Sequence, residues 1–222
     1  MKVAPWPSTL FTAMVPPLQD DAETRRWTPP TFIGATGPVL QRLAGSHYDG
    51  LLTASITTPG FVRYSRQNLD EGAKKAGRDP ETLELGSVVV GSIGNDRQKG
   101  REGAREMAAM YLANKVQNIR GSADMILQNA KLTFEEIQPI ADAMERWGRT
   151  AAARAVTDDI LRKVCPIAGT PEDCIAAIEQ YRAAGCTHIL LEVWGEDREA
   201  QAKLFGESVL PHFKGTAAAA RE

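Results

Sequence analysis

The sequence predicts an α/β fold in which the strands of a parallel sheet alternate with helices. Three observations predict it. Short β-branched stretches recur between longer stretches that have helical periodicity. The stretch Leu85–Ile93 carries three consecutive valines and is apolar on both faces, as expected of a strand covered by helices in a parallel sheet. Thr58-Pro59 and Thr170-Pro171 each place a capping residue before a proline, which is typical of a helix N-terminus.

The first thirty residues contain six of the thirteen prolines and follow neither periodicity, so residues 1–30 are expected to form an irregular lead-in. A regular alternation begins after them. Gly77 stands where the second helix should end, and Asn95-Asp96 stands where the third should be capped. The expected elements are strand 31–35, helix 38–44, strand 50–55, helix 59–76, strand 84–93 and helix 96–113.

Residues 114–164 show helix signals and no convincing strand, which predicts a helical insertion into the alternating pattern. Inside this segment, Thr133 and Glu136 have the spacing of a capping box, in which two side chains satisfy free amides at a helix start. A run of apolar residues with helical spacing follows them. The insertion should therefore contain at least one well-capped helix.

The alternation resumes with a helix from Pro171 to just before Gly185, then a strand at 188–194 and a last amphipathic helix. The main domain is expected to span residues 31–213, and residues 214–222 are expected to be a disordered tail. Four strands result, whereas a closed (β/α)8 barrel needs eight and about 250 residues. The pattern describes a partial barrel of about four βα units, or a small open sheet.

Composition limits the classes of partner. The chain has 222 residues, 43% of them hydrophobic, which is enough to bury an ordinary core. The net charge is −2 with acidic and basic residues interspersed, so neither nucleic acid nor a membrane surface is an expected partner. No stretch approaches the roughly 20 apolar residues of a membrane span, and no signal peptide is evident.

The cysteines and histidines give no metal or disulfide pattern. Three cysteines occur, Cys165, Cys174 and Cys186, and none forms a C-x-x-C pair, so we expect no disulfide framework, no metal site and a reducing, cytoplasmic environment. The three histidines are not spaced as metal ligands and do not suggest a Ser-His-Asp set. A structural or surface role is the expected one for each of them.

The segment Pro30–Pro38 holds the clearest functional signal. A β-branched and aromatic strand runs directly into the turn Gly34, Ala35, Thr36 and Gly37, and Pro38 then opens a helix. We expect the two glycines to allow backbone angles forbidden to other residues and to let a ligand approach the main chain. The helix N-terminus directs free N–H groups and its positive dipole end at the same place, which favours a phosphate or another anion.

Three phrases in order along the chain indicate a family. PPTFIGATGPVLQRLAGSHYDGLL, EGAKKAGRDPETLEL and PIAGTPEDCIAAIEQYRAAGCTHILLEVWG resemble the C-terminal half of the bacterial luciferase-like superfamily. Within that superfamily, they are most similar to the branch that uses the deazaflavin coenzyme F-420, such as methylenetetrahydromethanopterin reductase. The resemblance covers residues 29 to about 213.

The resemblance implies a TIM barrel with its cofactor at the carboxyl ends of the strands. It implies an oxidoreductase that transfers a hydride between F-420, or alternatively FMN, and a small organic substrate. Gly34, Ala35, Thr36 and Gly37 match the family turn that holds the phosphate side of the cofactor. Thr53 and Ser55 match the next loop, where a hydroxyl commonly reaches the same region.

The family's first strands, with most of the ring-binding and acid or base residues, have no counterpart in this sequence, so no catalytic residue is assigned. Half a barrel leaves strand edges unpaired, which predicts a homodimer or a partner that completes the barrel. The main alternative is a truncated, non-catalytic remnant that binds a flavin or phosphate without turnover. An unrelated phosphate-binding α/β protein is a third possibility, and it would depend on the Gly34–Gly37 turn alone.

A second group of candidates follows the last strand. Glu192, Trp194 and the turn Gly195-Glu196-Asp197 stand at the end where a barrel places its chemistry, and a carboxylate or an indole there could face a ring system. An exposed loop with one packed tryptophan is the alternative interpretation. Arg63 and Arg66 could neutralise a phosphate or a polyglutamate tail, although a solvated helix face is the commoner role of such arginines.

Overall fold

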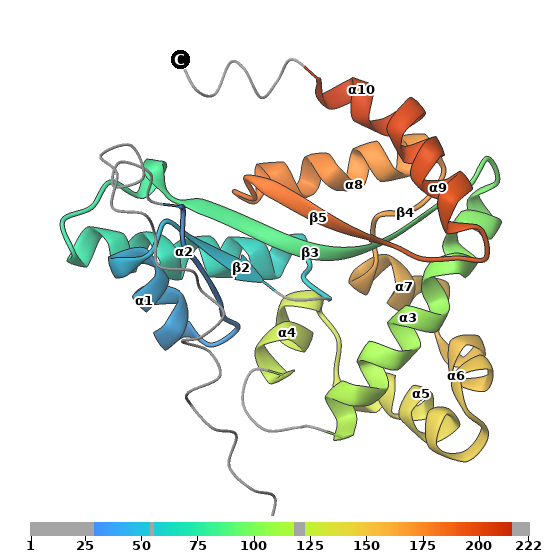
Figure 1. Cartoon of the computed structure of the whole chain (residues 1–222). Helices are drawn as coiled ribbons and strands as arrows, with labels where there is room; N and C mark the ends of the chain where they lie inside the picture. The colour runs from blue at the N-terminus through green and yellow to red at the C-terminus, as the bar shows by residue number, and fades with distance from the viewer. Residues whose placement is uncertain (1–28, 54–55, 118–122, 215–222) are drawn as a thin grey trace, which may run out of the picture. The chain divides into compact units, whose positions relative to one another are not determined.

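The computed structural model describes residues 29–53, 56–117 and 123–214. The chain divides into two units, Met1–Pro30 and Thr31–Glu222, and the strands and helices of the described residues lie in the second (Figure 1). The expected lead-in before residue 29, Ser55 and the expected tail after residue 214 lie outside the described residues. None of the described helices is both long and apolar enough to span a membrane.

The sheet is parallel throughout, as the sequence predicts. Its strands are β1 (Phe32–Gly34), β2 (Gly50–Thr53), β3 (Glu84–Ile93), β4 (Ala168–Gly169) and β5 (His188–Val193). The first three pair in chain order, and β5 pairs with the opposite edge of β3. Because neighbouring strands are joined through helices, the order produces an alternating α/β fold.

The expected count of four strands was one too low for the described residues. The additional strand, β4, has two residues and lies beside the end of β3, with Ser92↔Ala168 and Ile93↔Gly169 as partners. It lies on the same edge of β3 as β2, because the amides of Glu84 and Ser92 both donate toward that edge. Two residues are too few to produce a recognisable alternation in sequence.

One face of the sheet is buried under the connecting helices. Side chains alternate along a strand, and the odd-numbered residues Leu51, Leu85 and Val89 belong to one core cluster. This cluster also receives residues from α1 (Pro38–His47), α2 (Pro59–Lys75) and α8 (Pro171–Ala183). The helices begin as predicted: Thr58 caps α2, and Thr170 forms a capping box with Asp173 at the start of α8. Figure 1 shows α8 running alongside β3 and β5.

Helices α1 and α2 cross at two glycines, and this crossing fixes the position of the turn that precedes α1. A Cβ on Gly45 would lie 2.0 Å from the main-chain oxygen of Leu69, and a Cβ on Gly72 would lie 1.9 Å from that of Arg42. Neither contact is compatible with any larger residue unless the helices separate. The backbones therefore pack against one another with no side chain between them.

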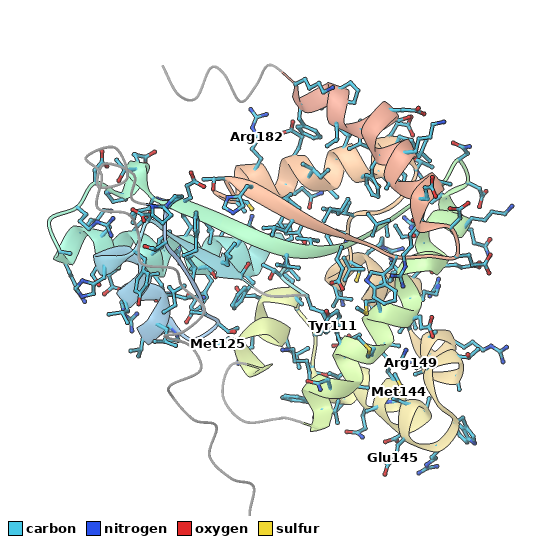
Figure 2. All side chains as sticks on the ribbon, in the orientation of Figure 1. Tyr111, Met125, Met144, Glu145, Arg149 and Arg182 are labelled. Carbon is cyan, nitrogen blue, oxygen red and sulfur yellow. The ribbon has the colours of Figure 1, made fainter. Side chains whose placement is uncertain are left out.

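Helix α3 (Arg97–Gln117) follows β3, as the alternation predicts, and the segment after it, predicted as a helical insertion at 114–164, contains α4 (Ala123–Ala130), α5 (Phe134–Trp147), α6 (Arg149–Ala155) and α7 (Asp158–Val164). These helices share a core cluster with α3. Thr133 and Glu136 form the predicted capping box at the start of α5. The cluster buries Leu112 of α3, Ile137 and Ile140 of α5, and Val90 from the even-numbered face of β3. In Figure 2, Tyr111 of α3 and Arg182 of α8 lie on opposite sides of the sheet.

The chain after β5 is helical. It consists of α9 (Arg198–Leu204), the π-helical turn η4 (Phe205–Val209) and α10 (Leu210–Phe213). Elsewhere in the chain, a short 3-10 turn, η3 (Pro80–Thr82), precedes β3. Phe205 and Val209 are buried in the same cluster as the odd-numbered strand residues. The predicted last helix is thus confirmed as three consecutive segments, of which α9 contacts β3 and β5 while η4 packs on α8.

Over the first halves of the strands, the sheet face that carries the even-numbered side chains is only partly covered. Leu190 of β5 is 45% exposed on this face. Phe32 and His188 meet edge to face across it, with ring centroids 5.7 Å apart. They can meet because Gly50 and Gly86 lie between them, where a Cβ would overlap one ring or the other. Within the described residues, the outer edges of β1 and β5 have no paired strand. An open sheet with one face partly uncovered has the form of a partial barrel.

Candidate functional site

The turn between β1 and α1 lies at the carboxyl end of an edge strand. The Ala35 amide still donates to Leu52 O of β2 at 3.1 Å, so the ladder extends one residue beyond β1. Helix α1 then begins at Pro38, with Gly37 as an N-cap residue that has no side chain to satisfy the helix amides. Within the described residues, the amides of Thr36, Gly37, Val39 and Leu40 have no hydrogen-bond acceptor. Such donors are what an anion binds at a helix N-terminus.

The expectation of unusual backbone angles at the turn was wrong. Gly37 has φ −81° and ψ 148°, and Gly34 is not among the glycines with positive φ. The strand passes into the helix through extended backbone, so no residue of the turn needs a positive φ. The two glycines do leave room, because a Cβ on either would have no atom within 4 Å. Their contribution is therefore open space beside the main chain.

A buried glutamine braces the turn from behind. The side chain of Gln41 in α1 is fully buried, and its Nε2 donates to Thr36 O at 3.1 Å and lies 3.4 Å from Ala35 O. The same nitrogen is 2.9 Å from Ser65 Oγ of α2. Gln41 was not among the site residues predicted from the sequence. The sequence signal for Gln41 was its spacing: it lies three and four positions before Ala44 and Gly45, so all three share the buried face of α1.

The Thr53 side chain points away from this turn's open side. It is 1% exposed on the helix-covered face, its Oγ1 is 2.8 Å from Ser87 Oγ, and it donates to Gly86 O. Thr53 shares this face with Leu51 because side chains two residues apart lie on the same side of a strand. Of the two hydroxyl residues expected near the phosphate, Thr53 is thus bonded within the protein, and Ser55 lies outside the described residues.

A cleft of about 890 Å³ opens at the carboxyl ends of β3 and β5. The predicted candidates Trp194, Glu196 and Asp197 line it, as Gly195 does. The guanidinium carbon of Arg198 lies 4.2 Å from the centroid of the Trp194 ring, a cation–π contact. The candidate turn does not contribute to this cleft. Both nevertheless lie at the end of the sheet where parallel strands place ligand-binding loops.

The cleft also contains charged residues that were not predicted from the sequence. They come from α3 and α9, and include Lys99, Glu102, Glu106 and Lys203. The sequence signal for the residues of α3 was their spacing: Lys99, Glu102 and Glu106 are three and four residues apart, which puts them on one side of a helix. Glu192, one of the predicted candidates, lies one step back along β5, where it accepts a 3.4 Å hydrogen bond from the Tyr111 hydroxyl of α3.

The arginines considered as phosphate neutralisers differ in their surroundings. Arg66 donates to the main-chain oxygens of Leu83 and Pro80 and forms a 2.7 Å ion pair with Asp70, so its guanidinium is committed to structure. Arg63 is exposed. In the described part of the chain, no group of three or more His, Cys, Asp or Glu side chains is arranged to hold a metal ion.

Sequence comparison relates the chain to one family. The profile of the luciferase-like monooxygenase family matches residues 3–188. The 5,10-methylenetetrahydromethanopterin reductase of Methanopyrus kandleri is 29% identical over 186 residues, which cover 83% of this chain and 51% of the relative. The F-420-dependent glucose-6-phosphate dehydrogenase of Nakamurella multipartita is 30% identical over 186 residues, which cover 83% of this chain and 48% of the relative.

Structural comparison agrees with the sequence match. The coenzyme F-420 dependent tetrahydromethanopterin reductase from Methanopyrus kandleri superimposes with a TM-score of 0.72 and 28% identity, over 83% of this chain and 51% of that chain. The chain spans about half the length of the curated relatives it matches. The predicted fold class, a partial luciferase-like α/β barrel, is confirmed by this superposition. Because the family profile covers most of its residues, this chain belongs to the luciferase-like monooxygenase family.

Proposed function

We propose that this chain binds the phosphate side of coenzyme F-420 at the Gly34–Gly37 turn and forms part of an oxidoreductase that transfers a hydride to or from a small organic substrate. The observation that carries the proposal is the set of main-chain amides at Thr36, Gly37 and the start of α1 with no acceptor in the described structure. Relatives with 29% and 30% identity are an F-420-linked pterin reductase and an F-420-dependent sugar phosphate dehydrogenase, which supports F-420 over FMN.

The residues present fit a phosphate group. A phosphate group beside Thr36 and Gly37 would accept from up to four amides, and its negative charge would lie at the positive end of α1. The open space beside both glycines leaves room for phosphate oxygens at the main chain. Once bound, the deazaflavin ring would supply the hydride chemistry. The chain's own contribution is to anchor one end of the cofactor, so that its ring is held at the carboxyl end of the sheet.

The Thr53 hydroxyl is bonded to Ser87. We therefore propose that Thr53 supports the end of β2 beside the turn and does not bond to the phosphate. Ser55 stays a candidate for the phosphate region from its match to the family loop. At the carboxyl ends of β3 and β5, Trp194 lines the cleft and would limit the space open to a substrate. No residue is proposed as the acid or base of the reaction.

We also propose that the working protein is a dimer or a complex that completes the barrel. The outer edges of β1 and β5 are unpaired in the described structure, and the face bearing Leu190 is partly exposed. Further parallel strands supplied by a partner would pair with both edges, cover this face and close the barrel. Light scattering on the purified chain tests this: twice the 24.1 kDa chain mass is expected. A monodisperse monomer with a folded spectrum would contradict the homodimer.

The cofactor is tested by titrating the purified chain with F-420 and, separately, with FMN, following the fluorescence of each. Saturable binding of F-420 is expected. Turnover is then assayed from the absorbance of the oxidised coenzyme, using the substrates of the named relatives. Binding without turnover would favour the non-catalytic alternative, and a folded chain that binds neither compound would refute the proposal.

A further inference from the structure

We infer that Gln41 is a positioning residue of the phosphate turn, whose side-chain amide fixes the direction of the Thr36 and Gly37 amides. The inference rests on the proposed function and adds a residue that does not itself touch the ligand. It follows from three features of the structure: the contacts of Gln41, the planarity of the peptide bond and an unmet acceptor on the Gln41 side chain.

The contacts place Gln41 directly behind the turn. Its Nε2 lies 3.1 Å from Thr36 O, 3.4 Å from Ala35 O and 2.9 Å from Ser65 Oγ. Gln41 and Ser65 are both completely buried. The side chain therefore joins two carbonyls of the turn to helix α2, which is itself locked against α1 by the glycine crossing.

Peptide planarity converts these contacts into a direction for two donors. In a trans peptide, the C=O of one residue and the N–H of the next lie in one plane and point in opposite directions. With the Ala35 carbonyl turned toward Gln41, the Thr36 amide points away from it. The Thr36 carbonyl sets the Gly37 amide in the same way. One buried side chain thus aims two adjacent donors at the open side of the turn.

The third feature argues against a role in packing alone. The Oε1 atom of Gln41 is buried without a hydrogen-bond partner in the described structure. An unmet acceptor in a protein interior is destabilising, and an apolar side chain of similar length would fill this space without it. The benefit that Gln41 brings must therefore come from the donors on Nε2, two of whose acceptors belong to the turn.

The test compares the wild-type chain with Gln41→Met, which keeps the side-chain length and removes the donors. Each 15N-labelled protein is titrated with inorganic phosphate while the Thr36 and Gly37 amide resonances are followed. We expect phosphate to shift both resonances in the wild type and to bind Gln41→Met about tenfold more weakly, the effect of losing one well-aimed charge-assisted hydrogen bond. Melting temperatures of both proteins show whether the change in affinity reflects loss of folding.

The matched control is Asn68→Leu. Asn68 is also a buried polar residue between α1 and α2, where it accepts a 2.7 Å hydrogen bond from Arg42, but it contacts neither carbonyl of the turn. Phosphate affinity should therefore be unchanged in this variant at temperatures where it is folded. An equal loss of affinity in Asn68→Leu and Gln41→Met would overturn the inference, because the effect would then belong to the helix interface in general.

The remaining outcomes separate the inference from the proposed function. If Gln41→Met binds phosphate as tightly as the wild type, Gln41 has no positioning role and the proposed function stands. If the wild-type turn responds to neither phosphate nor F-420, the proposed function fails first. Should Gln41→Met not fold, the wild-type Gln41 side-chain NH2 signals decide: slow exchange with solvent, with and without phosphate, supports the brace, and rapid exchange refutes it.

Discussion

Replacing Gly37 by aspartate should stabilise the protein while weakening its binding of the cofactor. Gly37 is the N-cap residue of α1 and offers no side chain to the helix amides. Its φ of −81° and ψ of 148° suit any L residue, and a Cβ there would meet no atom within 4 Å. A carboxylate at this position can accept from an amide two or three residues further on, so the helix would satisfy its own N-terminus.

The size of the stabilisation can be estimated from three contributions. Exchanging glycine for a better N-cap residue contributes a few tenths of a kcal/mol. A negative charge at the positive end of the helix contributes about 0.3–1 kcal/mol. Lower backbone freedom in the unfolded chain contributes roughly 0.4–1 kcal/mol. The sum is about 1–2 kcal/mol, which raises the melting temperature of a chain of this size by roughly 2–8 °C.

The same carboxylate should lower F-420 affinity at least tenfold, because it occupies an amide and repels the phosphate. Thermal unfolding and F-420 fluorescence titration measure the two effects on one protein sample. Gly37→Ala separates the two causes, since its Cβ takes up open space beside the main chain but carries neither an acceptor nor a charge, and it should lower F-420 affinity less than Gly37→Asp does. Normal F-420 affinity in a stabilised Gly37→Asp protein would refute the phosphate turn. A destabilised variant would show that the helix amides already have acceptors.

Three further predictions concern the fold. Gly45→Ala should destabilise the protein by about 2 kcal/mol in urea unfolding, because its Cβ would lie 2.0 Å from Leu69 O and the overpacking exceeds the gain in helix propensity; unchanged stability would contradict the tight α1–α2 crossing. Two hydrogen bonds from Arg97, at 2.7 and 2.9 Å, hold the pKa of Asp173 below its usual value, so the pair contributes stability above about pH 4. The stability difference between wild type and Arg97→Gln should therefore vanish as the pH falls through the lowered pKa, and a difference that persists at pH 2 would refute the assignment. All three cysteines are buried, and burial raises the pKa of Cys165 to about 12, so a thiol reagent should modify none in the native state and three after unfolding; rapid native labelling would contradict the burial.

The elements with strong local signals could be predicted from sequence. Thr58, Thr133 and Thr170 each precede a helix and cap it in the structure, because a capping side chain acts on amides only two or three residues away. The long apolar strand β3 has the predicted limits, since burial of both faces leaves a continuous apolar run. Strand β4 was missed because its two residues are specified only by their partners on β3.

The candidate site divides in the same way. The sequence by itself determined that a strand, a small-residue turn and a helix N-terminus follow one another at Gly34–Pro38, because these are properties of consecutive residues. Only the tertiary structure decided that the Thr53 hydroxyl is bonded to Ser87, and that Gln41 and Ser65 meet behind the turn. These contacts join residues 24 and 34 positions apart, and they depend on strand register and on a helix crossing fixed by two glycines. Local sequence sets the conformation of a segment, whereas the direction of its polar groups depends on the segments packed against it.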